Sequence, residues 1–172
     1  DADGDGIGDG YLVAGGTTTI DSYIDPNLAN AADAAEDAYV VKLDENGDIL
    51  WTKTLAGNHN DRLSSSIETT DGYVVAGETR STDVSGHHVG VGVNINNRDL
   101  WVIKLDKASG DSTWQRCLGG SLEEYVRHIL ADPADGSIVV MGDVNSINGD
   151  RTGPFLGGYD IWIVKLNNSD GT

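Results

Sequence analysis

Several residue types are scarce in this sequence, and each scarcity excludes a class of protein. Cys117 is the only cysteine among 172 residues, so no disulfide can form within the chain. Lys and Arg number 11 against 28 Asp and Glu, a formal net charge of −17. This charge opposes binding to nucleic acid or to anionic lipid. No apolar run approaches the roughly 20 residues of a membrane-spanning helix, so we expect no membrane insertion.

The sequence motifs of common enzymes are also absent. There is no G-x-S-x-G nucleophile elbow, no phosphate-binding G-x-x-x-x-G-K-[ST] loop, and no G-x-G-x-x-G that opens a helix. A glycoside hydrolase needs two acids in a cleft, and Asp61, Glu123 and Glu124 are candidates only in that general sense. Cys117 stands where Thr54 stands in another copy of its segment, so we expect a small buried side chain there. The sequence therefore favours a protein without catalytic activity.

What the sequence does contain is a repeat. One apolar segment with a central lysine occurs three times: Tyr39–Asp44, Trp101–Asp106 and Trp162–Asn167. The lysines at 42, 104 and 165 are separated by 62 and 61 positions, and an aspartate precedes each segment at the same offset. Apolar side chains fall on both faces of each segment, which predicts strands buried between two layers.

Three further strand types recur with the same period. We predict these strands at 11–15, 73–77 and 138–142, at 49–55 and 112–118, and at 62–69 and 125–131. Each unit thus holds four antiparallel strands in about 62 residues. Such a meander cannot cover its own faces, so neighbouring units must stack. We predict an all-β fold with an acidic lead-in at 1–8 and a repeat domain at 9–172, in units of about 9–70, 71–134 and 135–172.

The repeat resembles a known family of β-propeller-like proteins secreted by bacteria and archaea. The resemblance rests on Asp-Gly-Tyr-Val-Val-Ala-Gly at 71–77, a long polar loop, Asp-x-Trp-x-x-Lys-Leu-Asp at 99–106, a following Trp and Gly-Gly at 119–120. It covers residues 9–172 and implies a stack of four-stranded antiparallel blades, about 2.5 of them in this chain, open or completed by another chain or segment. It also implies an extracellular or cell-surface location.

Carboxylates alternate with glycines in the first ten residues. Calcium binds six to eight oxygens, and this spacing supplies the side chains of Asp1, Asp3, Asp5 and Asp9 with the carbonyl of Ile7. The segment resembles the calcium loops of thrombospondin type 3 and dockerin-like repeats, so Ca²⁺ is the predicted ion. Leu12 stands where a helix-loop-helix calcium hand needs a bidentate Glu, and an unliganded acidic lead-in is the alternative.

The long loops before the lysine segments are the other candidate site. Antiparallel topology gathers them at one edge, where binding surfaces are commonly built. The candidate ligand-binding residues there are Asp83, His87, His88, Asn148, Asp150 and Tyr159. Such side chains make calcium sites or sugar-binding clefts, but they also occur in any solvated loop. His87 and His88 lack a partner at zinc-ligand spacing.

Eight repeated residues have a structural interpretation. Aspartates at strand starts can accept backbone N–H groups, and aromatic side chains fill the spaces between units. These residues are Asp37, Asp99, Asp160, Tyr39, Trp101, Trp162, Trp51 and Trp114.

We therefore expect a non-catalytic structural or adhesive module of the cell surface, calcium-stabilised, with its open sheet edges paired to another copy or to the rest of a longer chain. The alternative is a carbohydrate-binding or carbohydrate-active propeller domain, with glycans as partners.

Overall fold

Strands form in this protein where β-branched and aromatic residues run together between glycine-containing turns. The structure, a computed structural model, describes residues 10–18, 35–86, 97–154 and 156–172. Within these ranges the strands are β1 (Tyr11–Thr17), β2 (Asp37–Leu43), β3 (Ile49–Leu55), β4 (Asp61–Thr69), β5 (Gly72–Thr79), β6 (Asp99–Asp106), β7 (Ser112–Leu118), β8 (Glu124–Ala131), β9 (Ile138–Val144) and β10 (Asp160–Leu166). The predicted all-β class is confirmed. None of the described residues forms a helix with the length and apolar character that crossing a bilayer requires.

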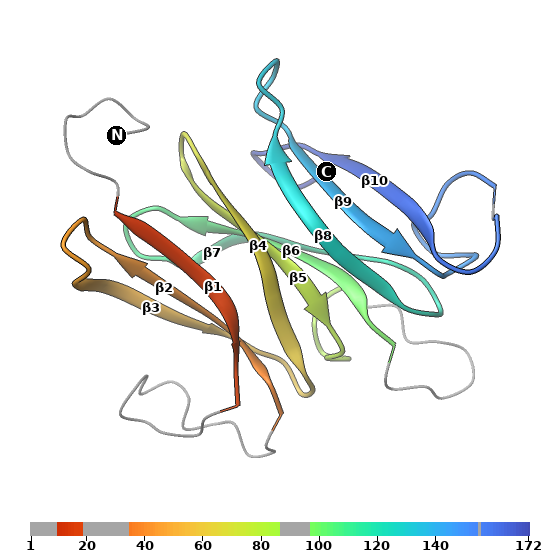
Figure 1. Ribbon diagram of the computed structural model, residues 1–172, viewed down its shortest axis with the longest axis horizontal. Helices are drawn as coiled ribbons and strands as arrows, with labels where there is room; N and C mark the ends of the chain where they lie inside the picture. The colour runs from red at the N-terminus through yellow and green to blue at the C-terminus, as the bar shows by residue number, and fades with distance from the viewer. Residues whose placement is uncertain (1–9, 19–34, 87–96, 155) are drawn as a thin grey trace.

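The strands form three antiparallel sheets (Figure 1). The first sheet has the order β1-β2-β3, the central sheet β4-β5-β6-β7, and the third β10-β9-β8. Sheet boundaries are offset from the sequence units 9–70, 71–134 and 135–172, because β4 and β8 each pair with the strand that follows them. Each sheet is therefore a simple meander.

One pairing register recurs in all three sheets. The repeated lysine lies opposite Leu12 in the first sheet, Val74 in the central sheet and Val139 in the third, and β2 and β6 also share a bulge directly after this lysine. Equivalent residues can therefore be compared between sheets by position alone.

Two apolar cores lie between the sheets. Alternate residues of β5 and β6 point to opposite faces, so Tyr73 and Trp101 pack against the first sheet while Val74 and Leu100 pack against the third. The central sheet is covered on both faces, as its apolar composition predicts.

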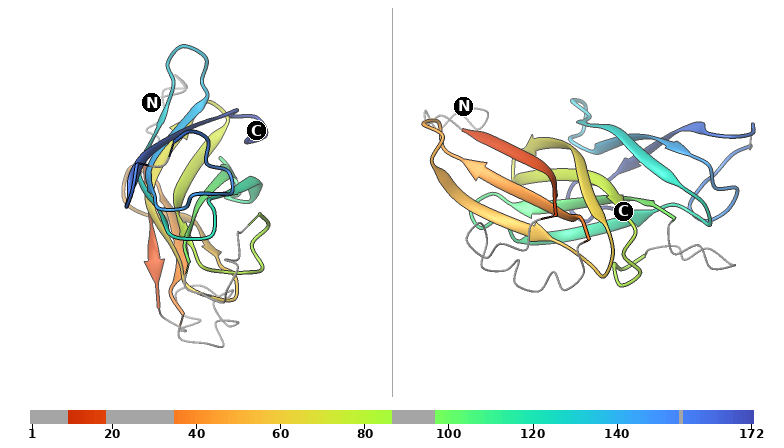
Figure 2. Two further views of the ribbon diagram at one scale, coloured as in Figure 1. Left: turned by 90° about the vertical axis from the view of Figure 1, so that its right-hand side faces the viewer. Right: turned by 60° about the horizontal axis from the view of Figure 1, so that its bottom comes forward.

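The sheets follow one another in chain order and pack through their faces (Figures 1 and 2). β4 lies next to β1 on one side and β8 on the other, and Ser65 Oγ of β4 accepts the N–H of Ile129 in β8 at 3.2 Å. The first sheet (red to orange) flanks the central sheet (yellow to green), which is followed by the third (cyan to blue).

Antiparallel pairing separates the connections into two edges. The loop edge comprises the described parts of the connections β1–β2, β3–β4, β5–β6, β7–β8 and β9–β10. The turn edge comprises the short turns 44–48, 70–71, 107–111 and 132–137, and residues 167–172 after β10. The predicted ligand-binding loops belong to the loop edge.

Candidate functional site

A buried carboxylate organises the loop edge between the first and central sheets. Asp61 opens β4, and its Oδ2 accepts hydrogen bonds from Gly57 N at 2.8 Å and Ser81 Oγ at 2.7 Å. Its Oδ1 accepts one from Thr79 Oγ1 at 2.5 Å. Burial raises the pKa of Asp61, and these hydrogen bonds oppose the shift. The carboxylate therefore joins the loop before β4 to the end of β5.

Glu124 repeats this arrangement between the central and third sheets. It opens β8 and accepts hydrogen bonds from Gly120 N at 3.1 Å and Ser146 N at 3.0 Å. Burial raises the pKa of Glu124, and the negative charge of Asp99 adds to the shift. A longer acid thus replaces Asp61 in the same role.

Two predicted ligand residues accept hydrogen bonds from the backbone of these same loops. Asp83 Oδ1 accepts the N–H of Asn58 at 2.9 Å, and Asn148 Oδ1 accepts the N–H of Ser121, also at 2.9 Å. Both acceptors satisfy backbone donors that no strand partner reaches. Each is therefore engaged by the scaffold.

The repeated aspartates lie at the starts of the lysine strands. Asp37 and Asp99 are buried. Asp160 forms an ion pair of 2.6 Å with Arg151 and accepts the N–H of Leu156, in the loop before it, at 3.1 Å. Asp150, another predicted ligand, accepts the N–H of Gly119 at 3.1 Å. Asp150 and Asp160 therefore hold loop backbone by their carboxylates.

Cys117 is a buried thiol in the core between the first and central sheets. Its Sγ donates a weak hydrogen bond to Asp99 Oδ2 at 3.6 Å. Burial, and secondarily the charge of Asp99, raises the pKa of Cys117 far above its ordinary value. A thiol held in its protonated form is not a nucleophile.

The four repeated tryptophans lie in the seams between sheets, whereas Tyr39 lies on the outer face of the first sheet. Trp101 and Trp162 are core residues, and Tyr39 is half-buried. Trp51 and Trp114 each donate an indole N–H to a turn of the next sheet, to Lys107 O at 3.4 Å and to Asn168 O at 3.0 Å. Neither pair offers an open stacking platform.

Trp51 and Trp114 each cover a glycine in a turn of the next sheet. Gly110 and Gly171 have φ of +72° and +70°, and a Cβ on either would lie 2.7 or 2.8 Å from the ring of Trp51 or Trp114. Gly47 is the equivalent in the first sheet, and a Cβ there would meet nothing within 4 Å. Among the described residues, no tryptophan therefore covers Gly47.

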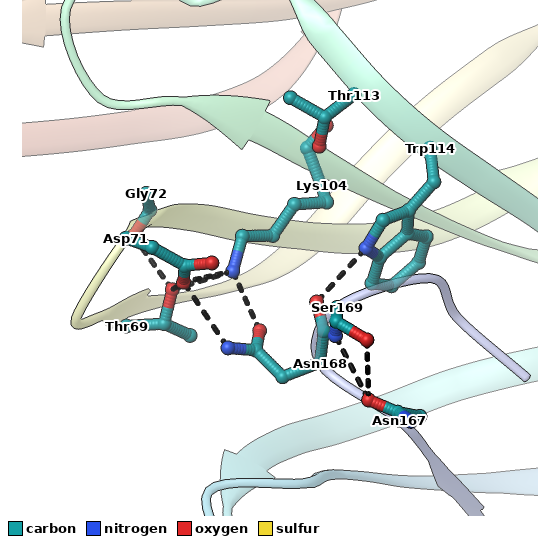
Figure 3. A network of polar contacts seen from close by, with 9 residues as sticks. All are labelled: Thr69, Asp71, Gly72, Lys104, Thr113, Trp114, Asn167, Asn168 and Ser169. Atoms are coloured by element: carbon teal, nitrogen blue, oxygen red, sulfur yellow. Dashed lines mark hydrogen bonds and ion pairs between the residues drawn. The ribbon is translucent and has the colours of Figure 1, made fainter.

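A polar network centred on one of the repeated lysines crosses the turn edge (Figure 3). The buried ammonium of Lys104 donates to Thr69 Oγ1 at 2.9 Å, Asp71 Oδ1 at 2.5 Å and Asn168 Oδ1 at 2.6 Å. The hydrogen bond from Lys104 lowers the pKa of Asp71. Asn168 follows β10, so this lysine ties the central sheet to the third.

The loop edge also holds a polar cleft that the sequence did not reveal. Its volume is about 220 Å³, and its lining includes three arginines of a chain with few cations: Arg62, Arg80 and Arg98. Glu78 in the cleft wall accepts the N–H of Val126 at 3.0 Å, and burial raises the pKa of Glu78. Cations and carboxylates therefore face one space.

Beside the cleft lies a cluster of aromatic and charged side chains, the tyrosine–arginine cluster: Arg98, Glu123, Tyr125, Arg127 and Tyr159. The rings of Tyr125 and Tyr159 lie 5.8 Å apart, and Arg98 and Arg127 lie 5.1 and 5.7 Å from the Tyr125 ring centre. Tyr125 donates to Glu123, which raises the pKa of Tyr125 to about 12. Tyr159, a predicted ligand residue, is exposed here.

The remaining predicted ligands, Asp1, Asp3, Asp5, Ile7, Asp9, His87 and His88, lie outside the described residues. Within the described residues, no group of three or more His, Cys, Asp or Glu side chains could hold a metal ion. The calcium assignment stays a prediction from sequence.

Comparison with known proteins identifies no relative. No protein-family model matches this sequence, and no curated protein matches it at a significant level.

A recurrence in the sequence marks the two buried carboxylates. Gly57 and Asp61 recur as Gly120 and Glu124, each 63 positions later. The exchange of Asp for Glu hid the equivalence. The repeat could not predict a role for Arg98, because Glu36 and Tyr159 occupy its position in the other copies.

Proposed function

We propose that this chain is a non-catalytic structural or adhesive module of propeller-like β-repeats, located outside the cell or at its surface. The observation that supports it most is the role of the loop-edge carboxylates. Asp61 and Glu124 are buried and accept hydrogen bonds from the loops that they hold. Their oxygens are occupied by loop and strand donors, so they act as structural ties.

The propeller-like arrangement is supported by the way the sheets pack. Three meanders of one register lie face to face, and β1, β4 and β8 follow one another along one side. Propellers stack four-stranded sheets in this way around an axis. The outer faces of the first and third sheets then pack against further units of the same kind.

A glycan-binding role is the second candidate, and the tyrosine–arginine cluster supports it. Tyr159 presents an exposed ring 5.8 Å from that of Tyr125, and the guanidinium groups of Arg98 and Arg127 lie over the Tyr125 ring. Aromatic rings stack on sugars. Arg127 already donates two hydrogen bonds to Asp143 Oδ2, at 2.8 and 2.5 Å, so Arg98 is the guanidinium that would pair with a ligand carboxylate. The ligand class that fits is a sugar carrying a carboxylate.

A glycan panel tests both candidates together. Neutral and uronic-acid oligosaccharides are titrated into the protein by calorimetry, and each mixture is assayed for new reducing ends. The scaffold proposal expects no turnover, and turnover by the folded protein overturns it. The glycan proposal expects saturable binding that Tyr159→Ala removes and Tyr11→Ala, an equally exposed tyrosine elsewhere, retains.

Calcium is the proposed stabilising ion, with the carboxylates of Asp1, Asp3, Asp5 and Asp9 as ligands. A site that binds only the folded chain adds about 2.7 kcal/mol of stability at a hundredfold excess over Kd. The melting temperature is therefore expected to fall when a chelator is added. The double variant Asp3→Asn/Asp5→Asn should lose this response, whereas Glu45→Gln should keep it. An identical chelator response in both variants contradicts the assignment.

A further inference from the structure

We propose that two copies of this protein associate head to tail, the outer face of the first sheet of one copy packing against the outer face of the third sheet of the other. The proposal rests on the scaffold function above and names its partner. The front face comprises Tyr11, Val13, Tyr39 and Val41. The back face comprises Val139, Met141, Ile161 and Ile163.

The front face has the composition of a buried seam. Tyr11 pairs with Leu43 as Tyr73 pairs with Leu105, so Tyr11 and Tyr73 occupy equivalent positions. Tyr73 is 2% exposed because the first sheet covers it, whereas Tyr11 is 61% exposed. Val13, the equivalent of buried Val75, is exposed as well.

The back face shows the same contrast at the other end of the molecule. Ile161 and Leu100 each follow the repeated aspartate that starts the strand. Leu100 is 1% exposed under the third sheet, whereas Ile161 is 84% exposed. Ile163 is exposed where its equivalent Val102 is buried. Apolar side chains at these positions are normal for a covered surface and unusual for an open one.

The chain contains two seams between sheets. In each seam, a face equivalent to the back face packs against a face equivalent to the front face of the next sheet. In the first seam, Ala38 and Val40 pack against Tyr73 and Trp101. In the second seam, the equivalent positions of the central sheet pack against the front-type face of the third sheet, which includes Trp162. The open front face and the open back face are therefore the two halves of one interface that the chain already forms twice.

A contact between unlike faces is heterologous. Each copy then keeps one unused front or back face, so the assembly either closes or grows. Two copies bring together six sheets, within the range of about four to eight that closed propellers use. Dimers and longer chains contain the same contact, and either state supports it.

The contact between copies has fewer polar ties than the internal seams. Trp51 and Trp114 cover Gly110 and Gly171, whereas the equivalent glycine of the first sheet, Gly47, is uncovered. Among the described residues, β10 is the edge strand of the third sheet. No described strand follows β10 that could place a tryptophan over Gly47 of the neighbouring copy. The association is therefore expected to be reversible and to depend on concentration.

Charge sets the conditions of the test. Each copy carries a formal net charge of −17, so repulsion opposes association at low ionic strength. The Debye length shortens from about 30 Å at 0.01 M salt to about 8 Å at 0.15 M salt. Association is therefore expected to strengthen when NaCl is added.

The test measures mass with two face variants of the 172-residue chain. Val13→Glu places a charge on the front face and Ile163→Glu places one on the back face, both at positions exposed in a single copy. Ile147→Glu, an exposed loop position outside both faces, is the matched control. Sedimentation or light scattering is recorded from micromolar to near-millimolar concentration, with circular dichroism to verify folding.

The parent protein and Ile147→Glu are expected to form dimers or larger species. Each face variant alone should remain a monomer, because association needs one intact front and one intact back. Mixing the two variants in equal amounts should restore a dimer and nothing larger. Self-association of either face variant, or unchanged association in both, overturns the head-to-tail contact.

The two proposals fail separately. A parent protein that stays a folded monomer throughout, with no turnover in the glycan assay, overturns the association of copies and leaves the scaffold function intact. Turnover in that assay overturns the scaffold function whatever mass is measured.

Discussion

The central sheet and the third sheet carry the same strand motif in different surroundings. Leu100 and Val102 in β6 are sealed under a neighbouring sheet, whereas Ile161 and Ile163 in β10 face outward. The apolar character of the strand is thus fixed by position in the repeat and not by exposure within this chain. Because the same motif occurs in a covered and an uncovered strand, comparing the two separates the contribution of packing to stability from that of the local sequence.

The largest difference is expected when this apolar residue is truncated in both sheets. Leu100→Ala leaves a cavity between two sheets and should lower the free energy of unfolding by about 2–5 kcal/mol. Ile161→Ala removes an exposed side chain and should change it by no more than about 0.5 kcal/mol in a monomer. Urea unfolding at low protein concentration measures both values. Equal losses would mean that the seam between the central and third sheets does not form.

A smaller difference is expected for the repeated lysine. Lys104 is 3% exposed and makes three hydrogen bonds, whereas Lys165 is 49% exposed and pairs with Asp132 and Asp135 at 2.7 and 2.9 Å. Lys104→Met should destabilise by about 1.5–3 kcal/mol. Lys165→Met should destabilise less than Lys104→Met, because solvent screens its ion pairs. The same urea titrations measure both, and a larger loss at Lys165 contradicts the network in Figure 3.

The smallest effect is a difference in pH dependence between the two edges. Burial raises the pKa of Asp61 in the folded protein above its unfolded value. The stability that this group contributes is present below the unfolded pKa, about 3.9, and is lost as pH rises through the folded pKa. Relative to Asp61→Asn, the parent should therefore lose stability as the pH rises above the unfolded pKa.

Asp135 on the turn edge supplies the opposite control. Hydrogen bonds from Ser137 and Lys165 lower the pKa of Asp135 to about 2. Its stabilising contribution is present above the unfolded pKa and is lost as pH falls toward about 2. Asp135→Asn should therefore flatten the acid limb of the stability curve. If both variants shift the curve in one direction, the assignment of buried and exposed acids is wrong.

The strands were predictable because their pattern is local, whereas the contacts of the loop edge were not. Apolar runs between glycine turns placed all ten strands to within a few residues. Asp83 was predicted as a ligand residue, but its partner Asn58 lies 25 positions away across two strands. The cleft around Arg98 was missed because its residues differ between the copies, so periodicity carries no information about it.

The seam tryptophans give each junction its own optical reporter. Trp51 senses the junction of the first and central sheets, and Trp114 senses the junction of the central and third sheets. Because repeat proteins gain stability unit by unit from their neighbours, the junctions can open in sequence. Each junction also holds a core tryptophan, Trp101 in the first and Trp162 in the second, so replacing both indoles of one junction would leave fluorescence to record the separation of the other.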